Sequence, residues 1–225
     1  MSLPAVITAD TGMDVLTHAT EAYVSTLAND FTDGLALQAI KMVFEYLPRA
    51  VANGKNDPEA REKMHNAGTI AGMAFANAFL GVNHSIAHKI GAEFHVPHGR
   101  ANAILMPHVI RYNGTKPEKP GIWPKYNYYK ADEKYAELAR LLGLKFKTTA
   151  EGVEAYANAC GNLGKDCGIQ MSFKDQGIDE KGFSCSLRVD DDGRGFCLRK
   201  GGGAGTGRHL FLSDLYFCQQ CAGGR

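Results

Sequence analysis

The residues best suited to chemistry are an aspartate and a group of histidines in two separated segments. Asp14 and His18 are four residues apart. On a helix this spacing places both side chains on one face, where they can meet a single cation. Five of the eight histidines fall between residues 84 and 108, in an otherwise apolar and alanine-rich stretch. Burying several imidazoles without partners is costly, and a shared cation would satisfy them together. The two segments together therefore indicate a metal site.

Each piece taken alone has a more ordinary explanation. An isolated aspartate–histidine pair such as Asp14 and His18 is more often a surface or capped polar pair than a metal site. A lone His98 would carry no more weight. The metal interpretation depends on the pieces occurring together.

Helices are predicted to position these residues. From 30 to 47 apolar residues recur every three or four positions, and Pro48 marks the predicted end of that helix. At 57–59 a capping aspartate precedes proline, which is typical of a helix start. In the body of this second helix, Gly68 and Gly72 predict the close approach of a neighbouring helix.

Further helices are expected over 83–94, 101–111, 130–142 and 151–163. No alternating strand pattern and no internal repeat is found up to about residue 170. After residue 180 the character changes, because ten of the last 45 residues are glycine and glutamate is absent. We expect a helical domain over 1–180 and an atypical Gly/Cys-rich tail over 181–225 that is flexible or translated out of frame.

Composition favours a small-molecule or protein partner. The formal charge of the 225-residue chain is +1, which gives no indication of binding to nucleic acid or to an anionic membrane. No stretch approaches the ~20 continuous apolar residues of a membrane helix, and the first residues lack the pattern of a signal peptide. The expected location is the cytoplasm.

Two longer strings resemble the signatures of the iron-containing alcohol dehydrogenase family. The first is GMDVLTHA followed by EAY, within 12–23, and the second is GVNHSIAH at 81–88, leading to PHG at 97–99 and ANA at 101–103. The likeness is greatest to the C-terminal alcohol dehydrogenase domain of the bifunctional aldehyde/alcohol dehydrogenases, and it covers about four fifths of the chain.

The resemblance implies specific roles. The implied metal ligands are Asp14, His18, His84 and His98. His88, one helical turn after His84, resembles the histidine beside the substrate and the nicotinamide, which is given a proton-relay role; packing near the site is the alternative for it. His95 and His108 are weaker candidates for a role at this site.

The implied chemistry suits these residue types. Three neutral imidazoles and one carboxylate leave a divalent cation with net positive charge and an open position for an aldehyde or alcohol oxygen. Such a cation acts as a Lewis acid during hydride transfer to or from NAD(H). The ligands suit iron(II), zinc or nickel; the resemblance implies Fe²⁺, with Zn²⁺ as an alternative.

The expected fold is all-α: the helical, metal-binding C-terminal domain of the iron-containing alcohol dehydrogenase / dehydroquinate synthase-like fold, lacking the N-terminal dinucleotide-binding domain. The expected parent enzyme interconverts a short-chain aldehyde, acetaldehyde above all, and an alcohol. The fragment alone is expected to be inactive, because the hydride donor has no complete binding site. We also expect the protein to form a homo-oligomer. Alternatives are a zinc-dependent polyol dehydrogenase-like domain and a non-enzymatic metal-binding or assembly module.

Overall fold

Helices make up most of the part of the chain that the structure describes. The computed structural model describes residues 3–115, 129–178, 186–189 and 196–199. Within these ranges the α-helices are α1 (Ala5–Val24), α2 (Asp30–Asn53), α3 (Pro58–Ala78), α4 (Val82–Phe94), α5 (His98–Asn113), α6 (Ala131–Leu141) and α7 (Thr149–Asp166). A short 3-10 helix, η1 (Lys174–Gln176), follows them. The prediction of a helical domain is confirmed for this part of the chain.

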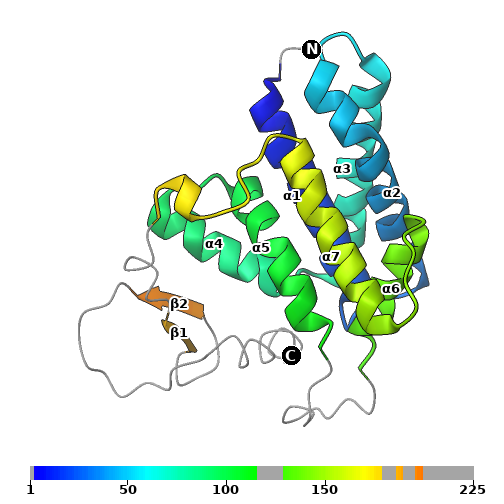
Figure 1. Ribbon diagram of the computed structural model, residues 1–225, viewed down its shortest axis with the longest axis vertical. Coiled ribbons are helices and arrows are strands. Elements are labelled where there is room, and N and C mark those ends of the chain that lie inside the picture. The colour runs from blue at the N-terminus through cyan, green and yellow to red at the C-terminus, as the bar shows by residue number, and fades with distance from the viewer. Residues whose placement is uncertain (1–2, 116–128, 179–185, 190–195, 200–225) are drawn as a thin grey trace.

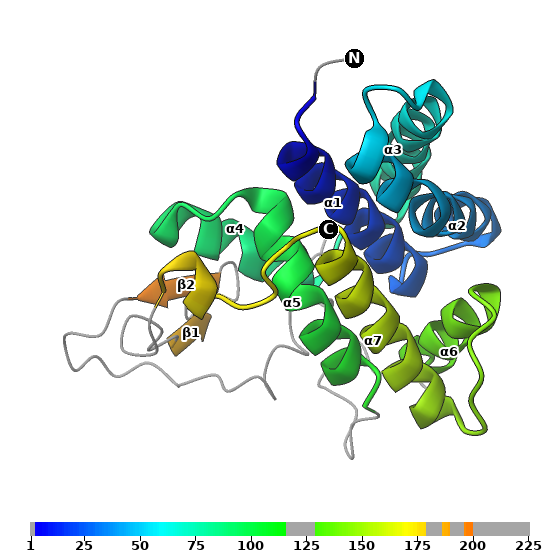
Figure 2. The same cartoon turned by 45° about the horizontal axis from the view of Figure 1, so that its top comes forward.

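The central helix is α1, which lies between the α2–α3 pair and α5 (Figures 1 and 2). Its apolar residues enter the main core together with residues from α2, α3, α5, α6 and α7. Met13 and Leu16 of α1 are fully buried there, and burying one such side chain contributes about 1.5–3 kcal/mol. Within the described ranges no single helix has the length and hydropathy to cross a membrane; α3 and α4, bent by 108°, satisfy those criteria only as a pair.

A second, smaller core joins α4 to α5. It contains Val82, Ile86, Ala87, Ile90, Val96, Ala101, Val109 and Ile178. Because these residues come mainly from α4 and α5, the apolar packing of α4 is largely separate from the main core. The candidate site lies where α4 and α5 face α1.

Polar caps define the starts of three helices. Asn29 forms a capping box with Thr32 at α2, and Thr148 forms one with Glu151 at α7. The Asp57 side chain accepts a hydrogen bond from a backbone amide at the start of α3. Each such cap contributes about 1 kcal/mol. The predicted start of α3 at the aspartate–proline pair is confirmed.

The predicted end, at Pro48, of the helix expected over 30–47 is wrong. Helix α2 continues through this proline to Asn53. Leu47 and Ala50, on either side of it, are fully buried, and Arg49 donates hydrogen bonds to Asp57 across the α2–α3 connection. Packing and this ion pair therefore outweigh the backbone hydrogen bond that the proline removes.

The predicted close helix approach at Gly72 is also wrong. A Cβ atom added there would meet nothing within 4 Å, and one at Gly68 would meet Val15 at an ordinary 3.6 Å. The tight contacts are elsewhere. A Cβ on Gly12 would lie 2.2 Å from the Leu47 side chain, and one on Gly99 would lie 2.1 Å from a backbone oxygen of α1.

Beyond residue 180 the structure describes two short strands, β1 (Ser186–Val189) and β2 (Phe196–Arg199). They pair antiparallel, with Ser186 opposite Arg199, and β2 lies beside α4 (Figure 1). The rest of the tail predicted over 181–225 lies outside the described residues.

Candidate metal centre

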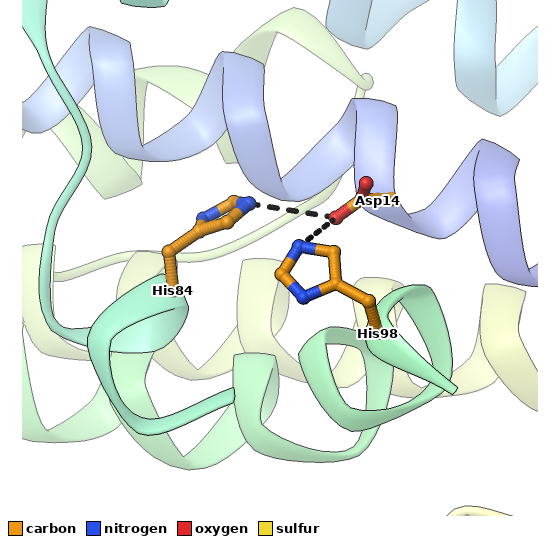
Figure 3. A group of neighbouring side chains, drawn as sticks. All are labelled: Asp14, His84 and His98. Atoms are coloured by element: carbon orange, nitrogen blue, oxygen red, sulfur yellow. Dashed lines mark ion pairs between the residues drawn. The ribbon is translucent and has the colours of Figure 1, made fainter. Parts of the chain in front are cut away.

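Asp14, on α1, meets histidines from α4 and α5. Its Oδ1 atom is 3.4 Å from Nε2 of His84 and 3.4 Å from Nε2 of His98. One ligand atom from each of the three residues lies within 4.8 Å of the other two. Figure 3 shows both rings directed at the carboxylate. This is the kind of donor set, two imidazoles and a carboxylate, that binds divalent transition metals.

His18, one helical turn after Asp14, borders this group. Its Nδ1 atom is 3.9 Å from Asp14 Oδ2. The ring stacks on Phe75 with centroids 4.6 Å apart and lies 4.3 Å from the His84 ring. Burial lowers its pKa to about 4 despite the nearby carboxylate, so the ring is neutral at pH 7, as a metal ligand must be. His18 is thus beside the three-residue group but not within it.

His84 provides the test of whether a metal fits. The side chain is 2% exposed. Its Nδ1 atom is 2.6 Å from Glu21 Oε2, whereas its Nε2 atom has no hydrogen-bond partner among the described residues. A buried polar nitrogen without a partner is costly. Because that nitrogen faces Asp14, a cation at this position would satisfy it, and the residues present fit a divalent metal.

The electrostatics of the group also favour a positive charge. Burial alone would lower the pKa of His84, but the carboxylates of Asp14 and Glu21 outweigh burial and raise it to about 9. Burial opposes the charged form of Asp14, yet the neighbouring imidazoles outweigh it and lower the pKa of that carboxyl. The site therefore holds an ionised carboxylate and attracts a cation, either a proton or a metal ion.

A buried polar network supports the ligands. Asn102 donates through Nδ2 to Asp14 Oδ1 at 2.7 Å and lies 3.1 Å from His98 Nε2. Asn83 donates to the Asn102 side-chain oxygen at 2.8 Å. Both asparagines are buried. The network thus connects α4, α5 and α1 around the carboxylate.

Sequence reasoning assigned no role to Glu21, Asn83 or Asn102. A signal for Glu21 was present, because it lies seven residues after Asp14 and three after His18, on the same face of α1. Asn102 is likewise one turn after His98. Asn83 has no such periodic signal, since only the fold places it against Asn102.

The other histidines lie around or away from the group. His88 is exposed, and its ring stacks on His98 with centroids 4.9 Å apart. Desolvation and the neighbouring imidazoles lower the pKa of His88. His95 ends α4 in a left-handed conformation, and His108 is exposed on α5. Neither makes a ring contact with the site histidines in the described part of the chain.

Close contact between α1 and α5 sets the distance across the site. Arg100 donates two hydrogen bonds of 3.0 Å to the carboxylate of Asp10. Next to it, Gly99 passes so near the Asp10 carbonyl that no Cβ atom would fit. These contacts hold the start of α5, and with it His98, against the turn of α1 that precedes Asp14.

The known proteins that this chain resembles point to one enzyme family. Residues 8–188 match the model of the Fe-containing alcohol dehydrogenase family, C-terminal. The chain is 68% identical over 181 residues to an aldehyde-alcohol dehydrogenase of Streptococcus pneumoniae, covering 80% of this chain and 20% of that protein. It is 47% identical over 190 residues to the bifunctional aldehyde-alcohol dehydrogenase of Escherichia coli, covering 83% and 21%. The chain thus spans about a fifth of the length of these relatives.

Solved structures share the fold. An iron-containing alcohol dehydrogenase from Thermococcus thioreducens superposes with a TM-score of 0.71 at 30% identity, covering 96% of this chain and 50% of that one. A 1,3-propanediol oxidoreductase gives 0.70 at 42% identity, covering 81% and 44%. The likeness of the two signature strings to this family is confirmed. The chain belongs to the Fe-containing alcohol dehydrogenase family and corresponds to its C-terminal domain.

Proposed function

We propose that this chain is the metal-binding domain of an alcohol dehydrogenase that interconverts a short-chain aldehyde, acetaldehyde in the first place, and the alcohol, with Fe²⁺ and NAD(H). The observation that carries the proposal is the convergence of Asp14, His84 and His98 on one point, with the buried His84 Nε2 atom 3.4 Å from Asp14 Oδ1 and without a hydrogen-bond partner among the described residues. The relatives named as aldehyde-alcohol dehydrogenases support the reaction class.

In this proposal Asp14, His84 and His98 hold the metal, and His18 completes the set. His18 is neutral and its Nδ1 atom is 3.9 Å from the Asp14 carboxylate, so this ring would supply a further nitrogen. A divalent cation bound there supplies a Lewis acid that polarises a carbonyl group.

His88 is proposed to transfer the proton to or from the substrate oxygen. Reduction of an aldehyde adds a hydride to carbon and needs one proton on oxygen, which a ring nitrogen of His88 can deliver or, in the reverse direction, accept. The side chain is exposed and stacked on His98, so it can exchange protons with solvent beside the site. Desolvation and the neighbouring imidazoles lower the pKa of His88 and so favour the neutral ring, which accepts the proton released in alcohol oxidation. In aldehyde reduction the ring first takes a proton from solvent and then passes it to the oxygen.

A chimera tests the proposal. Residues 8–188 replace the corresponding segment of the S. pneumoniae relative, to which this chain is 68% identical, and the protein is loaded anaerobically with Fe²⁺. We expect NADH-dependent reduction of acetaldehyde, one equivalent of metal in this domain, and loss of both in Asp14→Asn. The 225-residue chain alone should bind the metal without turnover. Full activity of the Asp14→Asn chimera, or of the metal-free chimera, would contradict the proposal.

A further inference from the structure

Glu21 is a buried carboxylate that reaches from α1 to the start of α4. It is 4% exposed. Its Oε1 atom accepts the backbone N–H of Asn83 at 2.6 Å, and its Oε2 atom is 2.6 Å from Nδ1 of His84. A weaker contact of 3.4 Å joins the His84 backbone N–H to Oε2. Both oxygens are therefore engaged by two adjacent residues of α4.

These contacts fix which nitrogen of His84 carries a proton. An ionised carboxylate can only accept hydrogen bonds, so the Nδ1 atom facing Glu21 must be the donor. In the neutral ring the lone pair is then on Nε2, the atom that lies 3.4 Å from Asp14 Oδ1. Metal ligation needs this tautomer, and a partner on the remote nitrogen commonly selects it.

We infer that Glu21 is a positioning residue that holds His84 in the tautomer and orientation that present Nε2 to the metal. The inference rests on the proposed function, because it concerns the same metal site. Glu21 then has two tasks, because the same carboxylate also caps the start of α4. Gly81, the N-cap residue of α4, has no side chain, so the Glu21 carboxylate supplies the missing acceptor for the first amides of α4.

Glu21→Gln separates the two tasks. A glutamine has one acceptor oxygen and one donor group. When the oxygen accepts the Asn83 N–H, the amide NH₂ faces Nδ1 of His84 and favours the opposite tautomer, with a proton on Nε2. The cap is then retained while metal ligation is impaired. Glu137→Gln is the matched control, because Glu137 also accepts a hydrogen bond across helices, from Tyr23 at 2.7 Å, but does not touch His84.

The experiment is a Co²⁺ titration of the 225-residue chain and its two variants, followed by visible absorption. We expect Glu21→Gln to weaken Co²⁺ binding about 10–100-fold and to change the absorption bands that report the ligands. Glu137→Gln should match the parent chain in both. Equal affinity and spectra for the parent and Glu21→Gln would overturn the inference while leaving the metal site standing. A parent chain that binds no Co²⁺ would overturn the proposed function and the inference with it.

A measurement without mutation covers the case in which Glu21→Gln does not fold. In the Zn²⁺-loaded parent chain, ¹⁵N NMR of the imidazoles reports the protonation of each ring nitrogen. We expect His84 to carry its proton on Nδ1, with Nε2 bound to the metal. Zn²⁺ on Nδ1, or a proton on Nε2, would overturn the inference.

Discussion

At the scale of single residues, the site is a negative charge surrounded by imidazoles that need a cation. Asp14 is 21% exposed and His84 only 2%. An ionised carboxylate beside buried rings is stable when a positive charge lies between them. The carboxylates of Asp14 and Glu21 raise the pKa of His84 to about 9 against the effect of burial, so in the protein without metal a proton on this ring supplies that charge. Metal binding replaces this proton and should release it to solvent.

The two stacked histidines at the edge of the site should differ in their effect on metal binding. His98 contributes a nitrogen to the three-residue group, whereas His88 only stacks on it. We expect His98→Ala to weaken Zn²⁺ binding by more than the roughly 10–100-fold typical of outer-shell changes, and His88→Ala to leave it nearly unchanged. Isothermal titration of both variants measures this. Equal losses in the two variants would show that His88 is a ligand.

At the scale of helices, the spacing of α1 and α5 depends on Gly99. A methyl group there would lie 2.1 Å from the Asp10 carbonyl oxygen, so the helices must separate. We expect Gly99→Ala to lower the free energy of unfolding by about 1–3 kcal/mol and to weaken Zn²⁺ binding, because His98 moves away from Asp14. Urea denaturation and metal titration measure the two effects.

Gly72→Ala is the matched control for this prediction. An added Cβ meets nothing within 4 Å at Gly72, which is also inside a helix. Alanine there should raise the free energy of unfolding by roughly 0.5–1 kcal/mol and leave metal binding unaltered. Similar destabilisation by both substitutions would mean that the α1–α5 contact is not the cause.

The start of α7 gives a separate test of helix capping. The Thr148 hydroxyl accepts the Glu151 N–H at 3.2 Å in the capping box. We expect Thr148→Ala to cost about 1 kcal/mol of unfolding free energy, measured by urea denaturation. In Thr69→Ala the change should stay within about 0.5 kcal/mol, because that exposed hydroxyl bonds only a carbonyl of its own helix. Equal costs would argue against a capping role.

The existence of the helices could be predicted from the local spacing of apolar residues, and the convergence of Asp14, His84 and His98 from two distinctive strings. The continuation of α2 beyond Pro48 could not, since it depends on the buried side chains and on an ion pair to the next helix. The same holds for the tight contacts at Gly12 and Gly99, which involve residues far apart in the chain. Periodicity shows which face of a helix is buried, but not which neighbour covers it.

At the scale of the whole domain, the candidate site joins two apolar cores. Helix α4 packs mainly with α5 in the smaller core, while α1 belongs to the larger one. The polar links from α1 to α4 converge on Asn83 and His84. A metal ligated by Asp14 and His84 would therefore add a strong bond between α4 and the main bundle.

This arrangement predicts that metal binding protects α4 selectively. Free Zn²⁺ at 100 times its Kd stabilises the bound state by about 2.7 kcal/mol. Amides of α4 that exchange only when the site opens should then exchange about 100-fold more slowly with deuterium. Helix α6 contributes none of the ligands, so amides there that exchange by local opening should be unaffected and serve as the internal control. His98→Ala should abolish the protection of α4. Protection spread evenly over the domain, or retained in that variant, would show that the metal does not connect α1 to α4.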